Sequence, residues 1–137
     1  MRSSQVDRQL TALAGEFFVA GELLKRGLQV SVTFGNAKAI DLFARNARTG
    51  CSFTIQVKAL RKWDGFPLRP DRVEREHIYV FVILNQPEQA VRYFVVPGAI
   101  LLHRDRAFRG FHHATFPGIH PNDLKDFEGK WEIFEAR

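Results

Sequence analysis

Two short stretches of the sequence combine polar residues with the alternation of a β-strand, and together they could bind a metal ion. In residues 52–58 (SFTIQVK), Gln56 and Lys58 share one face of a predicted strand, because strand side chains repeat every two residues. In residues 38–45 (KAIDLFAR), Asp41 interrupts a similar alternation. If the two strands form a simple antiparallel hairpin, Asp41 lies opposite Gln56, with Cβ atoms roughly 5 Å apart. A β-bulge would shift this register.

The predicted first helix, residues 6–27, carries a carboxylate on its apolar side. Drawn at 100° per residue, Glu16 projects between Ala20 and Leu23, inside the apolar sector. A carboxylate that faces the core is costly unless it meets a cation or several donors. Two interpretations stay open: Glu16 snorkels or pairs with an arginine at the edge of the sector, or it belongs to a site. The residues expected to form the core-facing stripe are Leu10, Leu13, Phe17, Ala20 and Leu24, widened by Val19 and Leu23.

Apolar patterns and turn residues predict one mixed-sheet domain of the α/β class. The run 78–84 (IYVFVIL) is almost continuously apolar, which predicts a strand buried on both faces. Short helices are expected in 98–104 and 121–135, whereas 59–76 and 105–120 resemble long connections. The expected order is α-β-β-β-(loop or helix)-β-β-α. The other strands are expected at 28–34, 38–45, 52–58 and 91–96.

Charge and composition indicate a cytoplasmic protein with an anionic partner. The 137 residues carry a net charge of +5, and the first 60 hold eight Lys and Arg against four Asp and Glu. Basic surface attracts nucleic acid by counterion release, although a solubilising surface gives the same balance. The single cysteine, Cys51, excludes an intramolecular disulfide, and no apolar run reaches the roughly 20 residues of a membrane span. We expect DNA as the partner and no membrane contact.

The densest basic stretch follows directly after Lys58. Because it contains aromatic residues, it could track a phosphate backbone and stack on a base. A flexible, solvated loop is the equal alternative. The residues predicted to bind nucleic acid are Arg61, Lys62, Trp63, Arg69 and Arg72.

Three segments resemble the motifs of the PD-(D/E)XK nuclease superfamily, which includes restriction endonucleases, archaeal-type Holliday-junction resolvases and Mrr-like nucleases. GEFFVAGELLKRG, AIDLFAR and FTIQVKAL resemble its helix glutamate, strand aspartate and (E/Q)xK motif, in the family's order. The resemblance covers about residues 10–96. It implies a single restriction-endonuclease-like domain over 1–137, with an αβββαβ core flanked by helices and a C-terminal helical extension over about 97–137. Ile40 stands where the family has proline, and Gln56 is neutral, as in Mrr-like members.

The resemblance also implies a function and a site. It implies a DNA endonuclease, dependent on Mg²⁺ or Mn²⁺, that acts in repair, recombination or defence, commonly as a homodimer. Lys58 would orient the attacking water. The implied metal ligands are Glu16, Asp41, Gln56 and the carbonyl of Val57, and the implied catalytic residues are Glu16, Asp41, Gln56 and Lys58. Because Gln56 lowers the negative charge of the site, a nuclease fold that has lost catalysis and only binds nucleic acid is the alternative. An unrelated α/β domain with a coincidental QVK is a third.

Overall fold

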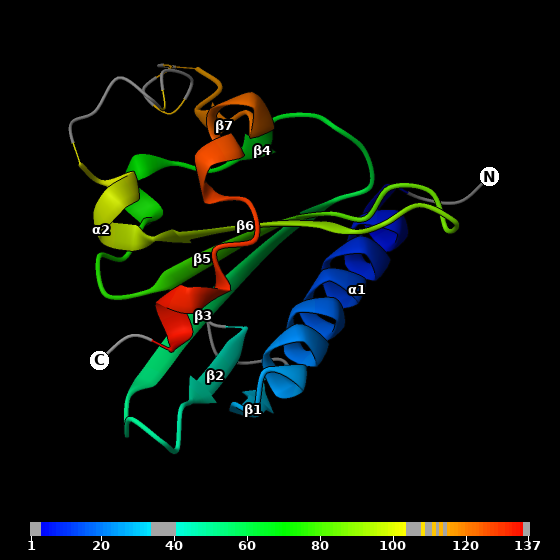
Figure 1. Ribbon diagram of the computed structural model, residues 1–137. Helices are drawn as coiled ribbons and strands as arrows, with labels where there is room; N and C mark the ends of the chain where they lie inside the picture. The colour runs from blue at the N-terminus through cyan, green and yellow to red at the C-terminus, as the bar shows by residue number, and fades with distance from the viewer. Residues whose placement is uncertain are drawn as a thin grey trace.

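The centre of the protein is a five-stranded mixed sheet, seen in a computed structural model that describes residues 4–33, 41–103, 108, 111, 113 and 115–135. Its strands are, in spatial order, β1 (Gln29–Val32), β2 (Leu42–Arg45), β3 (Ser52–Leu60), β5 (Ile78–Ile83) and β6 (Arg92–Pro97). The β3–β5 pair runs parallel and the other neighbouring pairs run antiparallel (Figure 1). This is the single α/β domain with a mixed sheet that the sequence predicts.

Each face of the sheet is covered by different elements. The helix α1 (Ser4–Lys25) packs on one face, where the turn η5 (Trp131–Phe134) joins the same apolar cluster. A second apolar cluster fills the other face, and β5 lies between the two with all six residues buried, as predicted. The elements of the second face are β4 (Phe66–Pro67), η1 (Pro70–Arg72), α2 (Gly98–Leu101), β7 (Gly118–Ile119), η3 (Pro121–Asp123) and η4 (Lys125–Phe127). No helix within the described ranges combines the length and the apolar character needed to cross a membrane.

The end of α1 agrees with the sequence, and its buried face agrees with the predicted stripe only in part. A glycine at the end of the apolar periodicity predicts a C-cap at Gly27. The structure confirms it, since Gly27 has a φ of 91° and the N–H of Leu28 donates to the carbonyl of Leu23 over 3.0 Å. The expected core-facing stripe is wrong at four positions that are exposed: Leu10, Leu13, Phe17 and Leu24. The stripe is confirmed at Val19, Ala20 and Leu23, which are buried together with Thr11 and Gly15.

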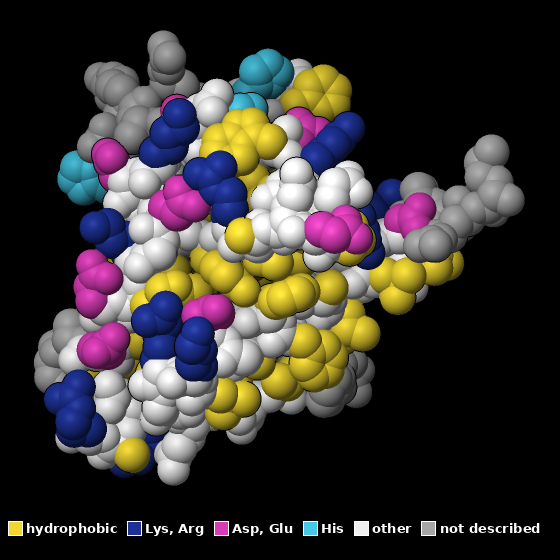
Figure 2. All heavy atoms as spheres, turned by 45° about the vertical axis from the view of Figure 1, so that its right-hand side comes forward, with side chains coloured by type: hydrophobic (Ala, Val, Ile, Leu, Met, Phe, Trp, Pro, Cys, Tyr) yellow, Lys and Arg dark blue, Asp and Glu magenta, His cyan; other side chains and the backbone are white. Residues whose placement is uncertain are grey.

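A close approach between α1 and β3 explains this difference. A Cβ added at Gly15 would lie only 2.6 Å from the Cβ of Ala59, so the helix rests on the strand through small residues. The larger apolar side chains are therefore left on the outside. We call them the outer stripe: Val6, Leu10, Leu13, Phe17 and Leu24. Hydrophobic side chains gather on the face that carries α1 (Figure 2).

The register of β2 and β3 agrees with the predicted hairpin until it reaches Asp41. Four residue pairs, from Arg45–Ser52 to Leu42–Ile55, are aligned as expected. The N–H of Asp41 then donates to the carbonyl of Ile55 over 3.0 Å, so Asp41 and Leu42 both face one residue of β3, as in a β-bulge. The predicted pairing of Asp41 with Gln56 is therefore wrong, because the bulge turns Asp41 toward the edge of β3.

The connections hold short strands that the sequence does not indicate. Residues 59–76 contain β4 and η1, and β4 pairs with β7 from the stretch predicted to be irregular. Strands of two residues are too short to have a periodic pattern. The stretch 121–135 forms the turns η3, η4 and η5 where one or two short helices are expected. Gly35–Asn36, whose residue types predict a turn, lies outside the described residues.

Candidate active site

Two carboxylates meet just before the first residue of β2, beside β3. Asp41 accepts a hydrogen bond from the backbone N–H of Val57 on one carboxylate oxygen, over 2.7 Å. This bond replaces the ladder contact that β2 would make if it continued. Glu16 reaches the same place from α1 and forms a side-chain hydrogen bond with Asp41. The contact of Gly15 with β3 brings Glu16 this near, so the helix, the bulge and the strand edge together build the pair.

The two carboxylates raise the cost of holding negative charge at this place. Burial raises the pKa of Glu16 to about 7, and the charge of Asp41 and the hydrogen bond to it add to the rise. A proton or a cation between the two groups relieves this cost. The pair therefore has the chemistry of a cation site, since Mg²⁺ prefers carboxylate, amide-carbonyl and water oxygens.

The stability of the metal-free protein should depend on pH through Glu16. The folded state binds the Glu16 proton more tightly than the unfolded chain, so this group makes folding less favourable as the pH rises from about 4.5 to about 7. Glu16→Gln should flatten this part of the profile and be more stable than wild type at about pH 8. Urea unfolding with EDTA measures it, and parallel profiles for the two proteins would contradict the expected pairing.

Gln56 is held by both of its amide hydrogens. The side chain is 2% exposed, and Nε2 lies 2.9 Å from Nδ1 of His77 and 2.9 Å from the hydroxyl of Tyr79. The Tyr79 hydroxyl also accepts the backbone N–H of Glu74 over 2.8 Å. The carbonyl oxygen of Gln56 has no hydrogen-bond partner among the described residues. Every side-chain nitrogen or oxygen there that is fully buried does have a partner. This oxygen therefore faces accessible space, as a ligand must.

His77 and Tyr79 are site residues that the sequence does not single out. Tyr79 lies beside Gln56 because β3 and β5 pair in parallel, and His77 directly precedes β5. One signal was present: Tyr79 carries a hydroxyl inside an apolar run, and a buried tyrosine hydroxyl requires a hydrogen-bond partner. Both residues orient the Gln56 amide.

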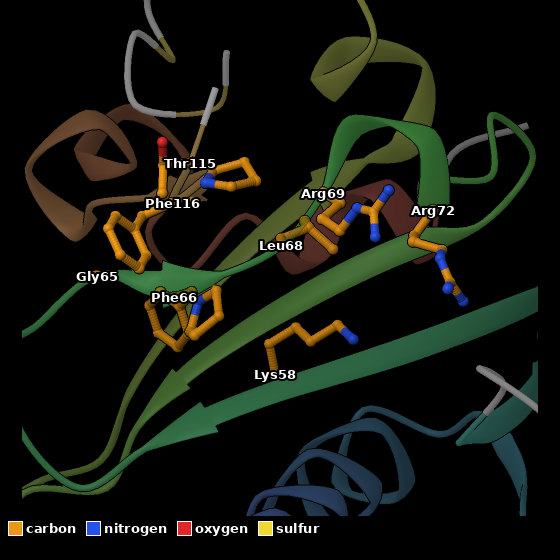
Figure 3. A pocket seen from close by; sticks show the side chains of 11 residues that line it. Lys58, Gly65, Phe66, Leu68, Arg69, Arg72, Thr115 and Phe116 are labelled. Carbon is orange, nitrogen blue, oxygen red and sulfur yellow. The ribbon is translucent and has the colours of Figure 1, made fainter. Parts of the chain in front are cut away.

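Lys58 leaves β3 on the same face as Gln56, as the alternation predicts. It lines an open pocket with residues of β4 and η1, on the side of the sheet opposite α1 (Figure 3). Among the described residues, its ammonium group has no hydrogen bond or ion pair. A partly buried lysine without a partner is free to contact an anion.

The predicted site residues therefore fall in two groups around one strand. Glu16 and Asp41 meet at the edge of β3, next to the N–H of Val57, whose carbonyl points to the same edge. Gln56 and Lys58 lie on the face toward the second apolar cluster. Within the described part of the chain, no three His, Cys, Asp or Glu residues are grouped as metal ligands, so the set has only two carboxylates.

The basic stretch after Lys58 divides between two sides of the protein. Nε of Arg61 donates to the Thr11 hydroxyl of α1 over 2.8 Å. Nε1 of Trp63 donates to the side-chain oxygen of Asn122 over 3.1 Å. The guanidinium of Arg92 lies over the Trp63 ring, 4.7 Å from its centroid. One ring face that was expected to stack on a base is thus covered.

Arg69 and Arg72, by contrast, line the same pocket as Lys58. Arg69 makes a two-pronged ion pair with Asp71, with distances of 3.0 and 2.8 Å, and both side chains are well exposed. Lys62 is exposed at the surface. Of the predicted nucleic-acid residues, Arg69 and Arg72 are the two that line this pocket.

Comparison with known proteins identifies the fold. No protein-family model matches the sequence, and no curated protein matches it. Among solved structures, the chain is similar to a bacterial homing endonuclease, I-Ssp6803I, with a TM-score of 0.59 and 15% sequence identity over 93% of each chain. At this identity the likeness shows the fold alone, which is the mixed-sheet α/β fold of that endonuclease.

Proposed function

We propose that the protein is a metal-dependent DNA endonuclease of the PD-(D/E)XK superfamily, in the variant with glutamine in the (E/Q)xK motif. The observation that carries this proposal is the contact of Glu16 with Asp41 at the bulged end of β2. The strand end does not need Glu16 for its hydrogen bonding, because Asp41 alone accepts the N–H of Val57. The fold shared with a homing endonuclease adds support.

The residues of this site fit a hard divalent cation such as Mg²⁺ or Mn²⁺. At the edge of β3, Glu16 and Asp41 would supply charged oxygens and Val57 a carbonyl oxygen. The carbonyl of Gln56 would have to reach the same cation from the neighbouring face of the strand. When bound, such a cation neutralises negative charge on the phosphate that is cleaved. The two amide hydrogens of Gln56 are already engaged, which favours its carbonyl as the ligand.

Lys58 would act on the phosphodiester from the other side of β3. Its ammonium group can donate to a phosphate oxygen and hold the attacking water in line with the leaving oxygen. The water oxygen then bonds to phosphorus and releases one proton to solvent, the P–O bond to the leaving sugar oxygen breaks, and that oxygen takes up a proton from solvent. Hydrolysis leaves one phosphate end and one hydroxyl end.

A catalytically degenerate nuclease fold that binds nucleic acid is the second candidate. The observation that favours it is the neutral Gln56, which leaves two carboxylates to hold the metal. The test is to incubate the wild type with linear, supercoiled and branched DNA in Mg²⁺ or Mn²⁺, beside a calorimetric metal titration. We expect cleavage and metal binding. If neither occurs at millimolar metal, the degenerate function replaces the nuclease.

We further propose that the protein acts as a homodimer whose copies meet along the outer stripe. Val6, Leu10, Leu13 and Phe17 follow one another at intervals of four, three and four residues, which is the spacing of a helix–helix seam. Exposed apolar patches of this kind mark interaction surfaces. Sedimentation should show a dimeric wild type and a monomeric Leu13→Glu variant. A monomeric wild type would contradict the proposal.

A further inference from the structure

A pocket of about 580 Å³ opens beside Lys58 and combines apolar walls with positively charged side chains. Its volume falls in the range of small-molecule sites, about 300–1,000 Å³. The walls are mainly apolar, and the cations lie together at one side (Figure 3). The residues that matter for its chemistry are Phe66, Leu68, Phe116, Lys58, Arg69 and Arg72.

Phe116 is the unusual wall residue, because its side chain is 80% exposed. Its loop is nevertheless tied down. Nδ1 of His113 accepts the N–H of Thr115 over 3.1 Å and that of Phe116 over 2.9 Å. Directly after this loop, Gly118 pairs with β4, and a Cβ there would lie 2.7 Å from the carbonyl oxygen of Phe66. The backbone that carries Phe116 is therefore held in place, and its exposed ring can serve as a stacking platform.

The charges of the pocket select an anion. Among the described residues, neither Lys58 nor the guanidinium of Arg72 has an ion-pair partner. Arg69 is engaged with Asp71, but an exposed ion pair of this kind holds weakly against a competing phosphate. A flat apolar group joined to a phosphate matches this combination, and a nucleotide is such a group. A base inside a duplex is stacked on both sides, so only an unpaired base could lie against Phe116.

We propose that this pocket receives one unpaired nucleotide of the DNA strand that is cut, with its base against Phe116 and a phosphate at Arg72 and Lys58. The inference rests on the proposed nuclease function and names its substrate class. Lys58 belongs to both the pocket and the candidate catalytic set, so the unpaired nucleotide lies next to the phosphate to be hydrolysed. Flaps, bulges and single strands are therefore preferred over continuous duplex.

The test measures DNA binding without metal, so that cleavage does not interfere. A fluorescent adenine analogue is placed at a single unpaired position in one duplex and at a paired position in another, and both are titrated with protein in EDTA. Wild type should bind the first DNA about tenfold more tightly, within the range of base–aromatic stacking. Phe116→Ala should reduce this preference below about twofold, whereas Phe116→Trp should keep it. Phe18→Ala is the matched control, since Phe18 is an exposed aromatic residue on α1.

Binding and cleavage together separate this inference from the nuclease function. Equal binding of the two DNAs, or a preference that survives Phe116→Ala, overturns the pocket assignment. A preference without cleavage in Mg²⁺ or Mn²⁺ supports the pocket and removes the nuclease. Cleavage without a preference removes the pocket and supports the nuclease, and failure both to bind in EDTA and to cut in Mg²⁺ or Mn²⁺ overturns both.

Discussion

Replacing Lys58 with alanine is expected to lower the single-turnover rate of Mg²⁺-dependent DNA cleavage by about 10²–10⁴-fold, the range of positioned proton donors. The fold should be unaffected, because the Lys58 side chain lines an open pocket and has no hydrogen bond or ion pair among the described residues. The rate is measured on supercoiled plasmid with protein in excess, so that weaker DNA binding does not contribute.

Asp41→Asn should reduce the same rate comparably by removing one anionic oxygen from the site. Asparagine keeps a carbonyl oxygen that can accept the N–H of Val57, so the bulged strand end is preserved. Lys25→Ala is the control for a lost lysine, since Lys25 is exposed at the end of α1. If the Lys58 and Asp41 variants cut as fast as wild type, the activity belongs to another site or to a contaminant.

Changes at Gln56 should separate ligand chemistry from packing. Gln56→Ala removes the carbonyl and leaves His77 and Tyr79 without their buried partner, so metal affinity should fall at least about tenfold. Gln56→Met has a similar volume and fills the space without an amide. It should lose metal affinity as strongly while retaining more of the stability. Calorimetric titration with Mn²⁺ and urea unfolding give the two quantities.

Gln56→Glu should hold or raise metal affinity and keep some cleavage, because it adds a negative oxygen to two carboxylates. Its carboxylate needs donors where the amide now donates. His77 can carry its proton on Nδ1, and the Tyr79 hydroxyl can turn to donate, so both partners are able to reverse. Metal affinity in Gln56→Ala equal to that of wild type would show that position 56 is not a ligand.

The alternation of side chains along short strands was enough to predict which candidate site residues of β3 share a face. It placed Gln56 and Lys58 on one face, and the continuous apolar run predicted that β5 is buried on both sides. The hairpin register also follows from the sequence as far as Leu42. These features depend on side-chain periodicity within one segment or on neighbouring segments, which a sequence contains directly.

The remaining features depend on contacts between distant segments. The buried face of α1 follows from how closely Gly15 approaches Ala59. Helical periodicity does not contain this distance, so it predicts burial for four residues that are exposed: Leu10, Leu13, Phe17 and Leu24. The partners of Gln56 come from β5 and the residues just before it, which only the parallel pairing with β3 brings near. The bulge at Asp41 turns one side chain off its regular face, and no residue in that stretch indicates it.

Because α1 contacts β3 closely on one face only, the residues on its outer face can change without moving the face that carries Glu16. Small residues fasten the inner side to the strand, so the position of Glu16 is set by the backbone of β3 and not by the outer stripe. A designer can therefore rewrite Leu13 or Leu24 to break, change or create an assembly without retuning the carboxylate pair. Substitutions on the outer stripe are therefore expected to leave the chemistry of the strand edge unchanged.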